Sequence, residues 1–496
     1  MNDHGKSDGP VVPARLPNKP GLLGAEVVEE RGPAKGNTAS ETRSGHGAGQ
    51  GVSSDLDRVR LLACRDRQVR FTALLHHVTV DRLRAAYLAI RPKAAPGVDG
   101  VTWRDYGVAL ESNLQDLHAR VQRGAYRAMP ARRVLIPKAD GRLRPLGIAA
   151  LEDKIVQRAL AEVLNAIYEQ DFLGFSYGFR PGRSPHDALD ALTVGIERRK
   201  VSWVLDADIR DFFGSLDRGW LETFLEHRIA DRRVLRLIQK WLNAGVIENG
   251  VKIDSERGTV QGAAISPLLS NVYLHYAFDL WADQWRRRNA HGDVILVRFA
   301  DDYVAGFQHR DDAERFLADL RARFAKFGLE LAENKTRLVE FGRFAAERRS
   351  KRGLGKPETF DFLGFTHICA STKTGRFKLK RVTSKKRMRA KLHQIKAELK
   401  HRWHLPIPEQ GAWLASVLAG HFRYYAVPDN IEALQQFRYA VGWHWLRALR
   451  RRSQRSRMTW QRMWRIIDRW LPHAHIQHPW PPTRFDARTQ GRSPVR

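Results

Sequence analysis

Residues 297–307, VRFADDYVAGF, place two adjacent carboxylates between two runs of apolar residues. The runs VILVRFA and YVAGF are typical of β-strands, so Asp301 and Asp302 fall in the turn of a predicted hairpin. Asp tolerates such turns, and an isolated Asp-Asp pair is most often a solvated one. Two unpaired carboxylates in apolar surroundings repel each other and are costly to bury, a conflict that a divalent cation removes.

A second predicted strand, WVLDADI at residues 203–209, supplies a third carboxylate. Asp206 and Asp208 lie two residues apart and therefore share a face, with Asp208 at the strand end. Three oxygen ligands of this kind favour Mg²⁺, with Mn²⁺ as the alternative. They indicate two-metal phosphoryl transfer, in which a 3′-hydroxyl attacks a triphosphate.

The charge of the chain indicates a polyanionic partner. Lys and Arg number 85 against 54 Asp and Glu in 496 residues, a net charge of +31. Residues 371–496 hold 28 of these cations against 6 carboxylates, and eight of the 14 tryptophans. Basic residues interleaved with aromatic rings suit RNA, although any single Trp is more often core and a basic surface is sometimes only soluble.

The remaining composition excludes several classes of protein. Two cysteines, Cys64 and Cys369, cannot build a disulfide framework or a Cys-rich zinc site. No run of 18 apolar residues occurs, and the N-terminus lacks the apolar core of a signal peptide. We expect a soluble cytoplasmic protein with no membrane partner.

Periodicity predicts the main elements. Residues 151–172 form an amphipathic helix, and ARRVLIPKADGRLRPLGIAA forms two strands around Asp140-Gly141. TFDFLGFTHI reads as one late strand, and nearly everything after residue 385 reads as helix.

The order of the motifs resembles that of the bacterial group II intron-encoded reverse transcriptases, or intron maturases, over roughly residues 90–496. The similar blocks are, in order, KAAPGVDGVTW, VLIPKADGRLRPLGIAALEDKIVQRAL, FSYGFRPGRSPHDAL, VLDADIRDFFGSLD, GTVQGAAISPLLSNVYLH, RFADDY, GLELAENKTRLVEF with FDFLGF, and GHFRYYAVPDN. A single block is weak, whereas eight in the family's order are highly specific.

The resemblance implies an α+β right-hand polymerase fold, with fingers and palm around a small antiparallel sheet, followed by an α-helical thumb/X (maturase) domain. The expected segments are a disordered tail (1–55), an N-terminal helical extension (56–117), the fingers and palm (118–365), the helical thumb/X domain (366–475) and a basic Pro-containing tail (476–496).

The same resemblance assigns site residues. Asp208, Asp301 and Asp302 correspond to the catalytic, metal-binding triad, with two Mg²⁺ ions, and Asp206 is a bystander. The residues that correspond to nucleotide-binding positions are Lys138, Arg144, Phe213, Gln261, Gly262 and Lys335. A surface cation is the alternative for Lys138 and for Arg144 alone, and a salt-bridged surface Lys is the alternative for Lys335. The neighbouring Phe212 is expected in the core.

RNA contacts are expected in the basic last quarter. The candidates are Lys385, Arg389, Lys396, Lys400, Arg450, Arg451, Arg452, Arg455 and Arg457. Such contacts position nucleic acid without reading its sequence, and a solvated helix face is the alternative.

The expected function is RNA-directed DNA synthesis from a primer 3′-OH, with binding of a group II intron RNA to assist splicing and mobility. Expected partners are the intron RNA, primer-template, dNTPs and target DNA, in a cytoplasmic ribonucleoprotein, with a homodimer left open. No endonuclease domain is expected, because the tail lacks paired cysteines. The alternatives are an RNA-binding splicing factor without polymerase activity, and a retron, diversity-generating or CRISPR-associated reverse transcriptase.

Overall fold

The computed structural model describes residues 50–137, 143–248, 251–253, 258–259, 261–452 and 458–489. These residues form two compact units, each assembled from separate stretches of chain. Unit 1 contains the described residues up to Ala128, Ala150–Asp171 and Glu222–Trp241, and unit 2 contains Met129–Ala149, Phe172–Leu221 and the residues from Leu242 onward. The helical extension expected over residues 56–117 is thus only part of a unit that draws on three stretches.

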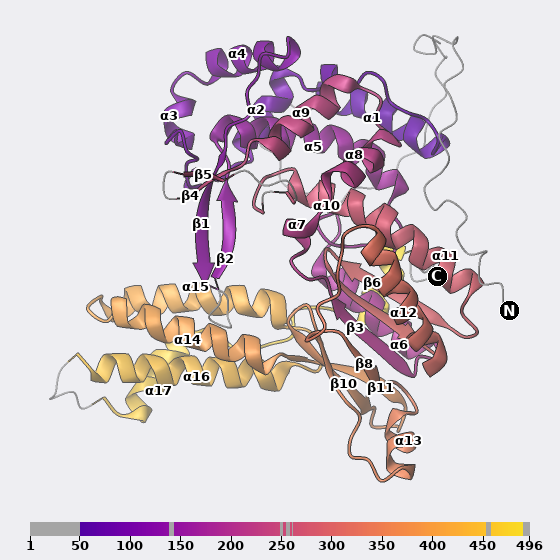
Figure 1. Ribbon diagram of the computed structural model, residues 1–496. Coiled ribbons are helices and arrows are strands. Elements are labelled where there is room, and N and C mark those ends of the chain that lie inside the picture. Colours follow the sequence, from indigo (N-terminus) through magenta and orange to yellow (C-terminus); the bar gives the residue numbers. More distant parts are fainter. Residues whose placement is uncertain are drawn as a thin grey trace. The chain divides into compact units, whose positions relative to one another are not determined.

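Unit 1 is built from helices. Its main elements are α1 (Gln50–Arg65), α2 (Val80–Leu88), α3 (Trp103–Gly107), α4 (Leu110–Gln122), α5 (Leu151–Asp171) and most of α9 (Arg232–Asn243) (Figure 1). The helix predicted over residues 151–172 is confirmed as α5, whose apolar stripe from Ile155 to Ile167 is buried. Helix α1 begins at Gln50, inside the segment expected to be a disordered tail.

A buried arginine joins the three stretches of unit 1. The Arg228 side chain, 2% exposed, pairs with Asp171 at 2.9 Å and donates to the carbonyl oxygens of Ala63, Asp66 and Val69. Burial raises the pKa of Asp171 to about 6, although the Arg228 charge opposes that rise. A cation that satisfies three distant carbonyl groups holds the 222–241 stretch against the N-terminal helices.

The central sheet of unit 2 is antiparallel, with strand order β6-β7-β3-β8. Its strands are β6 (Val294–Phe299), β7 (Asp302–Phe307), β3 (Trp203–Asp208) and β8 (Arg337–Glu340). Helices cover both faces. Val304 packs into the cluster that contains α6 (Pro185–Arg198), while its neighbour Tyr303 meets Phe324 of α12 (Arg310–Lys326) on the other face. Double coverage explains the nearly continuous apolar run of β6.

Two further sheets lie in unit 2. One has the order β2-β1-β4-β5, with β1 (Ala131–Pro137) antiparallel to β2 (Leu143–Ile148) and the short strands β4 (Val246–Glu248) and β5 (Val251–Ile253) beyond. The two strands predicted here are confirmed, and the predicted Asp140-Gly141 turn lies outside the described residues.

The third sheet corrects the sequence prediction. TFDFLGFTHI forms two strands, β9 (Phe360–Phe362) and β10 (Phe365–Ser371), because Leu363 and Gly364 adopt φ of 48° and 83° and break the run. The third strand, β11 (Phe377–Thr383), lies in the segment expected to be helical from residue 366. Its alternating burial of Leu379, Arg381 and Thr383 marks it as a strand, which the charges in FKLKRVT concealed.

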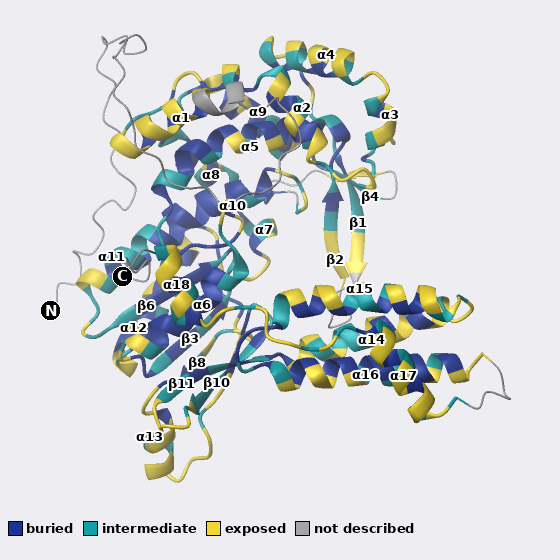
Figure 2. Cartoon of the chain, turned by 180° about the vertical axis from the view of Figure 1, so that it is seen from behind, coloured by how far each residue is buried: buried dark blue, intermediate teal, exposed yellow. Residues whose placement is uncertain are grey.

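Helices dominate after residue 384, as predicted. They are α14 (Lys385–His401), α15 (Ile407–Tyr425), α16 (Ile431–Arg450) and α17 (Trp460–Trp470), which share one apolar core around the fully buried Trp445. Exposed and buried residues alternate along these helices (Figure 2). We call this group the helical bundle. No described helix is long and apolar enough to span a membrane.

The C-terminal segment is not a free basic tail. Helix α18 (Pro481–Thr489) packs on α6 and buries Phe485. Its Arg484 and Arg488 pair with Asp190 and Asp187 of α6. These cations are committed to carboxylates, so the described part of the basic Pro-containing segment expected over residues 476–496 includes a helix that is docked on α6.

Candidate active site

Three aspartates gather at one end of the central sheet. Strand β3 ends at Asp208, which lies opposite Asp302 in the β3-β7 register. Asp301 occupies the two-residue turn between β6 and β7, after Ala300 at φ 58°. A positive φ at the first turn position suits the twist of a tight hairpin, but it normally calls for Gly. The predicted hairpin is confirmed, but only Asp301 lies in its turn, because Asp302 is already paired as the first residue of β7. The turn is held in a conformation that Ala does not favour.

A buried arginine holds this turn from behind. Arg298, 1% exposed, donates from Nη1 to the Ala300 carbonyl oxygen at 2.9 Å and to Asn271 Oδ1 at 3.1 Å. Its Nε and Nη2 atoms reach the two oxygens of Asp279 at 2.7 and 2.6 Å, and Nη2 also reaches Ser176 Oγ at 2.7 Å. Every side of the guanidinium is therefore engaged, which fixes the backbone that carries Asp301.

Asp279 reaches Arg298 through an irregular helix. The five residues His275–Asp279 form a π-turn between α10 (Ser266–Leu274) and α11 (Leu280–Arg288). Such bulges shift the direction of side chains along a helix and are frequent at functional sites. Asp279 is fully buried, and burial raises its pKa while the Arg298 charge lowers it.

A glycine allows close contact with the same turn. A Cβ atom on Gly178 would lie 2.2 Å from the Ala300 nitrogen and 2.8 Å from the Phe299 carbonyl carbon. The Gly178 carbonyl also accepts a 2.7 Å hydrogen bond from Asn271 Nδ2. Gly178 therefore packs backbone against backbone at the hairpin, a contact that no other residue type permits.

The carboxylates are poorly compensated by positive charge. Burial, followed by the charges of Asp208 and Asp301, raises the pKa of Asp302 to about 8. Burial also raises the pKa of Asp301, with Asp208 adding to the rise and Arg144 and Lys335 opposing it. Oxygen ligands that are costly to ionise without a partner are suited to a divalent cation.

Two cations lie beside the first strand of the site. Lys335 Nζ contacts Asp208 Oδ2, and Arg337 Nη2 lies 3.5 Å from Asp206 Oδ2. Burial raises the pKa of Asp206 to about 6, against the effect of Arg337. Asp206 is thus paired with Arg337 and lies two residues before the end of β3.

A large groove opens over the sheet end. Its volume is about 1640 Å³, and it is lined by the three aspartates together with Arg144, Phe213, Gln261 and Lys335. Phe213 is half-buried there, whereas Phe212 is 2% exposed. The structure thus brings four of the six expected nucleotide-binding residues to one groove with the triad.

The two remaining residues have other surroundings. Gly262 adopts φ 110°, and a Cβ atom there would lie 2.7 Å from the Gly147 carbonyl oxygen of β2, so its close approach is to the neighbouring strand. Lys138 lies outside the described residues.

The expected RNA-binding residues lie on the helical bundle. Lys385, Arg389, Lys396 and Lys400 are exposed on α14, and Arg450, Arg451 and Arg452 are exposed at the end of α16. Arg455 and Arg457 lie outside the described residues.

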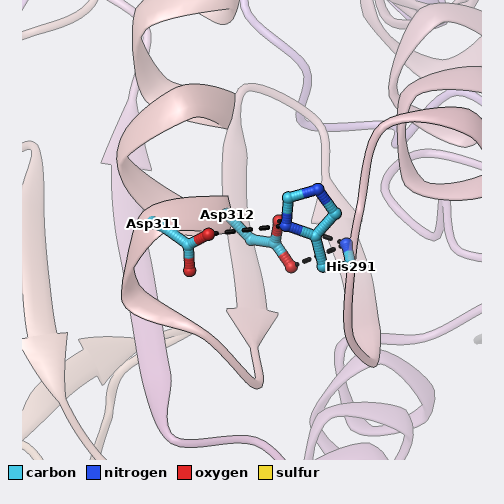
Figure 3. A group of neighbouring side chains, drawn as sticks. All are labelled: His291, Asp311 and Asp312. Carbon is cyan, nitrogen blue, oxygen red and sulfur yellow. Dashed lines mark hydrogen bonds and ion pairs between the residues drawn. The ribbon is translucent and has the colours of Figure 1, made fainter.

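A separate group of side chains that could ligate a metal is explained by its role in anchoring a helix. His291, Asp311 and Asp312 form the one group in the described residues whose donor atoms all lie within 4.8 Å of one another (Figure 3). Asp312 is fully buried and accepts from the backbone nitrogens of His291 and Gly292, each at 3.0 Å, and from Arg315. Its oxygens anchor the start of α12 to the loop before β6 and leave little capacity for a cation.

Sequence reasoning missed Arg298, Asn271, Asp279 and Gly178. An Arg within an apolar strand next to two acids is a usable signal, since a buried Arg requires acceptors. The identity of those acceptors depends on the tertiary contacts.

Comparison with known proteins identifies the class. Residues 136–367 match the family described as reverse transcriptase (RNA-dependent DNA polymerase). Protein YkfC of Escherichia coli (strain K12) is 35% identical over 277 residues, which are 49% of this chain and 72% of that protein. The chain therefore belongs to the reverse transcriptase family. The mixed helices and small sheets agree with the right-hand polymerase fold of that family.

Other relatives narrow the assignment. The group II intron-encoded protein LtrA of Lactococcus lactis subsp. cremoris is 37% identical over 166 residues, 33% of this chain and 27% of that protein. An uncharacterized 91 kDa protein in a cob intron of Schizosaccharomyces pombe is 46% identical over 147 residues, 29% of this chain and 18% of that protein. These similarities support the group II intron-encoded branch of the family, and they span less than a third of either relative.

Replacement of Gly178 tests the contact behind the hairpin. We expect Gly178→Ala to reduce primer extension at least tenfold, because the new Cβ displaces the turn that carries Asp301. Gly420→Ala is the matched control, since nothing lies within 4 Å of a Cβ at that helical position. It should keep full activity and gain slightly in stability, as Ala is the better helix former. Equal activity of the two variants would contradict the proposed tight packing.

The burial of Asp302 predicts a pH-dependent stability. Its pKa is near 3.8 when unfolded and about 8 when folded, so between these values the folded chain holds a proton that the unfolded chain has lost. Without divalent cations this stability is present at low pH and is lost as the pH rises through about 8. Melting temperatures measured in a chelator should therefore fall less steeply with pH for Asp302→Asn than for wild type. The exposed Glu432→Gln is the control, and parallel curves for all three proteins would contradict the account.

Proposed function

We propose that this chain extends a primer 3′-hydroxyl on an RNA template, with dNTPs as substrates, and that Asp208, Asp301 and Asp302 carry the reaction. The observation that supports the proposal most is the meeting of three partly buried carboxylates at one strand end, inside a groove that Arg144 and Lys335 also line. The reverse transcriptase match covers all of these residues.

The donor set fits hard divalent cations. All three groups offer oxygen, and the pKa values of Asp301 and Asp302 are raised by burial first and by neighbouring carboxylates second. Two Mg²⁺ ions bound there would activate the 3′-hydroxyl and stabilise the charge on the leaving pyrophosphate, with Mn²⁺ as a substitute. Asp208 and Asp302 on adjacent strands and Asp301 in the turn would hold these ions.

The other groove residues position the nucleotide. Arg144 presents a guanidinium to the triphosphate, whose oxygens suit its fork of donors. Phe213 provides a half-buried ring against which a 2′-hydroxyl would clash, which favours a deoxynucleotide. In this proposal Lys335, whose Nζ contacts Asp208, donates a proton to the leaving group.

The helical bundle is proposed as the thumb/X domain. Its long basic helices follow the central sheet in the chain, as expected for the part that holds primer-template and intron RNA. In this proposal the chain binds its intron RNA and assists splicing, and its target during mobility is DNA. The names of the LtrA relative and of the intron maturase of Arabidopsis thaliana support this part.

Primer extension by purified full-length protein on an RNA template with Mg²⁺ and dNTPs tests the proposal. We expect Asp301→Ala and Asp208→Ala to reduce synthesis by at least about a thousandfold, since each removes a metal ligand from the reacting centre. Asp206→Asn is the matched control, because Asp206 shares a face with Asp208 but pairs with Arg337. It should remain within a few-fold of wild type.

Two outcomes of this experiment would contradict the proposal. Folded wild-type protein that binds RNA but makes no DNA on any template, with either metal, would refute polymerase activity. Synthesis that survives Asp301→Ala would refute the assignment of the triad.

A further inference from the structure

A basic groove on the helical bundle is separate from the catalytic groove. Helices α14 and α16 pack along each other (Figure 1). The groove is lined by residues from both helices and has a volume of about 280 Å³. Six residues that define it are Lys396, Lys400, Trp403, His444, Arg447 and Arg451. None of them lines the groove over the sheet end.

The groove concentrates positive charge. None of the four Lys and Arg side chains forms an ion pair with a carboxylate of the described residues. Burial and the charges of Lys396 and Arg447 lower the pKa of His444, so the imidazole is neutral at physiological pH. Four like charges held together without acidic partners are unfavourable in the free protein and attract a polyanion.

An aromatic ring stands at the same place. The Trp403 side chain is 45% exposed, in the short connection between α14 and α15. Exposure of a Trp is unusual, because most of its surface is apolar. A ring that is open to solvent and bordered by cations is the arrangement on which unpaired bases stack.

The backbone that carries Trp403 is fixed from below. Gln410, fully buried, donates from Nε2 to the carbonyl oxygens of Arg402, Trp403 and Leu405 at 2.6, 3.2 and 3.2 Å. Its Oε1 accepts a 2.7 Å hydrogen bond from Trp445 Nε1 in the core. The backbone that carries the exposed ring is therefore held in place, which reduces the entropy lost when a ligand binds.

We propose that this groove binds one unpaired nucleotide of an RNA, with its base stacked on Trp403 and its flanking phosphates on Lys396, Lys400, Arg447 and Arg451. The volume of about 280 Å³ lies just below the range for ligand sites, roughly 300 to 1,000 Å³, so the groove suits a single base and not a duplex. The inference rests on the proposed RNA binding and adds that this site reads the structure of the RNA, through a base that is not paired.

Binding of short RNA hairpins to the full-length protein tests the inference. The probes are one hairpin with a single bulged adenosine, the same hairpin with an abasic site at the bulge, and a fully paired hairpin, each followed by fluorescence anisotropy. Wild type should bind the bulged hairpin on the order of tenfold more tightly than the other two, the effect of one stacked base. Trp403→Ala should abolish this preference, and Trp403→Phe should retain part of it.

Trp464→Ala is the matched control. Trp464 is 43% exposed on α17 of the same bundle but does not line the groove, so its loss should leave the preference intact. Lys400→Gln should weaken binding of all three hairpins and make it less dependent on salt. No preference in wild type, or a preference that survives Trp403→Ala, would overturn the inference.

The same wild-type preparation is assayed for primer extension on an unstructured template. DNA synthesis without a bulge preference refutes the nucleotide site alone. A bulge preference without DNA synthesis refutes the proposed polymerase activity and leaves the site standing.

Discussion

The electrostatic repulsion among Asp208, Asp301 and Asp302 at one end of the central sheet is the constraint that the surrounding structure has to accommodate. The sheet is covered on both faces, so the carboxylates have limited access to water, and the pKa of Asp302 rises to about 8. Packing and hydrogen bonds around the hairpin hold the carboxylates together against this repulsion. Arg298 and Gly178 contact the backbone of the hairpin turn, and Asn271 hydrogen-bonds to both of them, so the turn is held in a conformation that Ala300 does not favour. The Lys and Arg side chains near these carboxylates balance their negative charge only in part. The site therefore suits the binding of metal cations.

Buried arginines also hold distant segments of the chain together elsewhere in the structure. Arg228 joins three stretches of unit 1, and in unit 2 Arg381 and Asp190 form a buried pair that Arg484 of α18 completes. A buried ion pair adds little net stability, but loss of one partner is costly because it strands a charge. These pairs therefore specify which distant segments meet. They also explain why a chain rich in Arg does not present all of its cations to nucleic acid.

The sequence was sufficient for features with local signals. Hairpin residues 297–307, helix α5 and strands β1 and β2 follow from periodicity and turn residues, and the acids of the candidate site follow from their positions at strand ends. Features that depend on tertiary contacts could not be predicted from the sequence. Strand β11 carries half-buried lysines and a buried arginine, α18 follows a Pro-rich stretch, and unit 1 gathers residues more than a hundred positions apart. Periodicity also cannot tell the exposed Trp403 from the buried Trp445, since only the packing of α14, α15 and α16 separates them.

The central claim is that the sheet end is a cation site whose ligands are unfavourable without the cation. Its most direct test is the binding of Mn²⁺ to full-length protein, measured by electron paramagnetic resonance, for wild type and Asp302→Asn. The account predicts that wild type binds Mn²⁺, that Mg²⁺ displaces it, and that Asp302→Asn weakens binding at least tenfold while it remains folded. Equal Mn²⁺ affinity of the two proteins would contradict the claim.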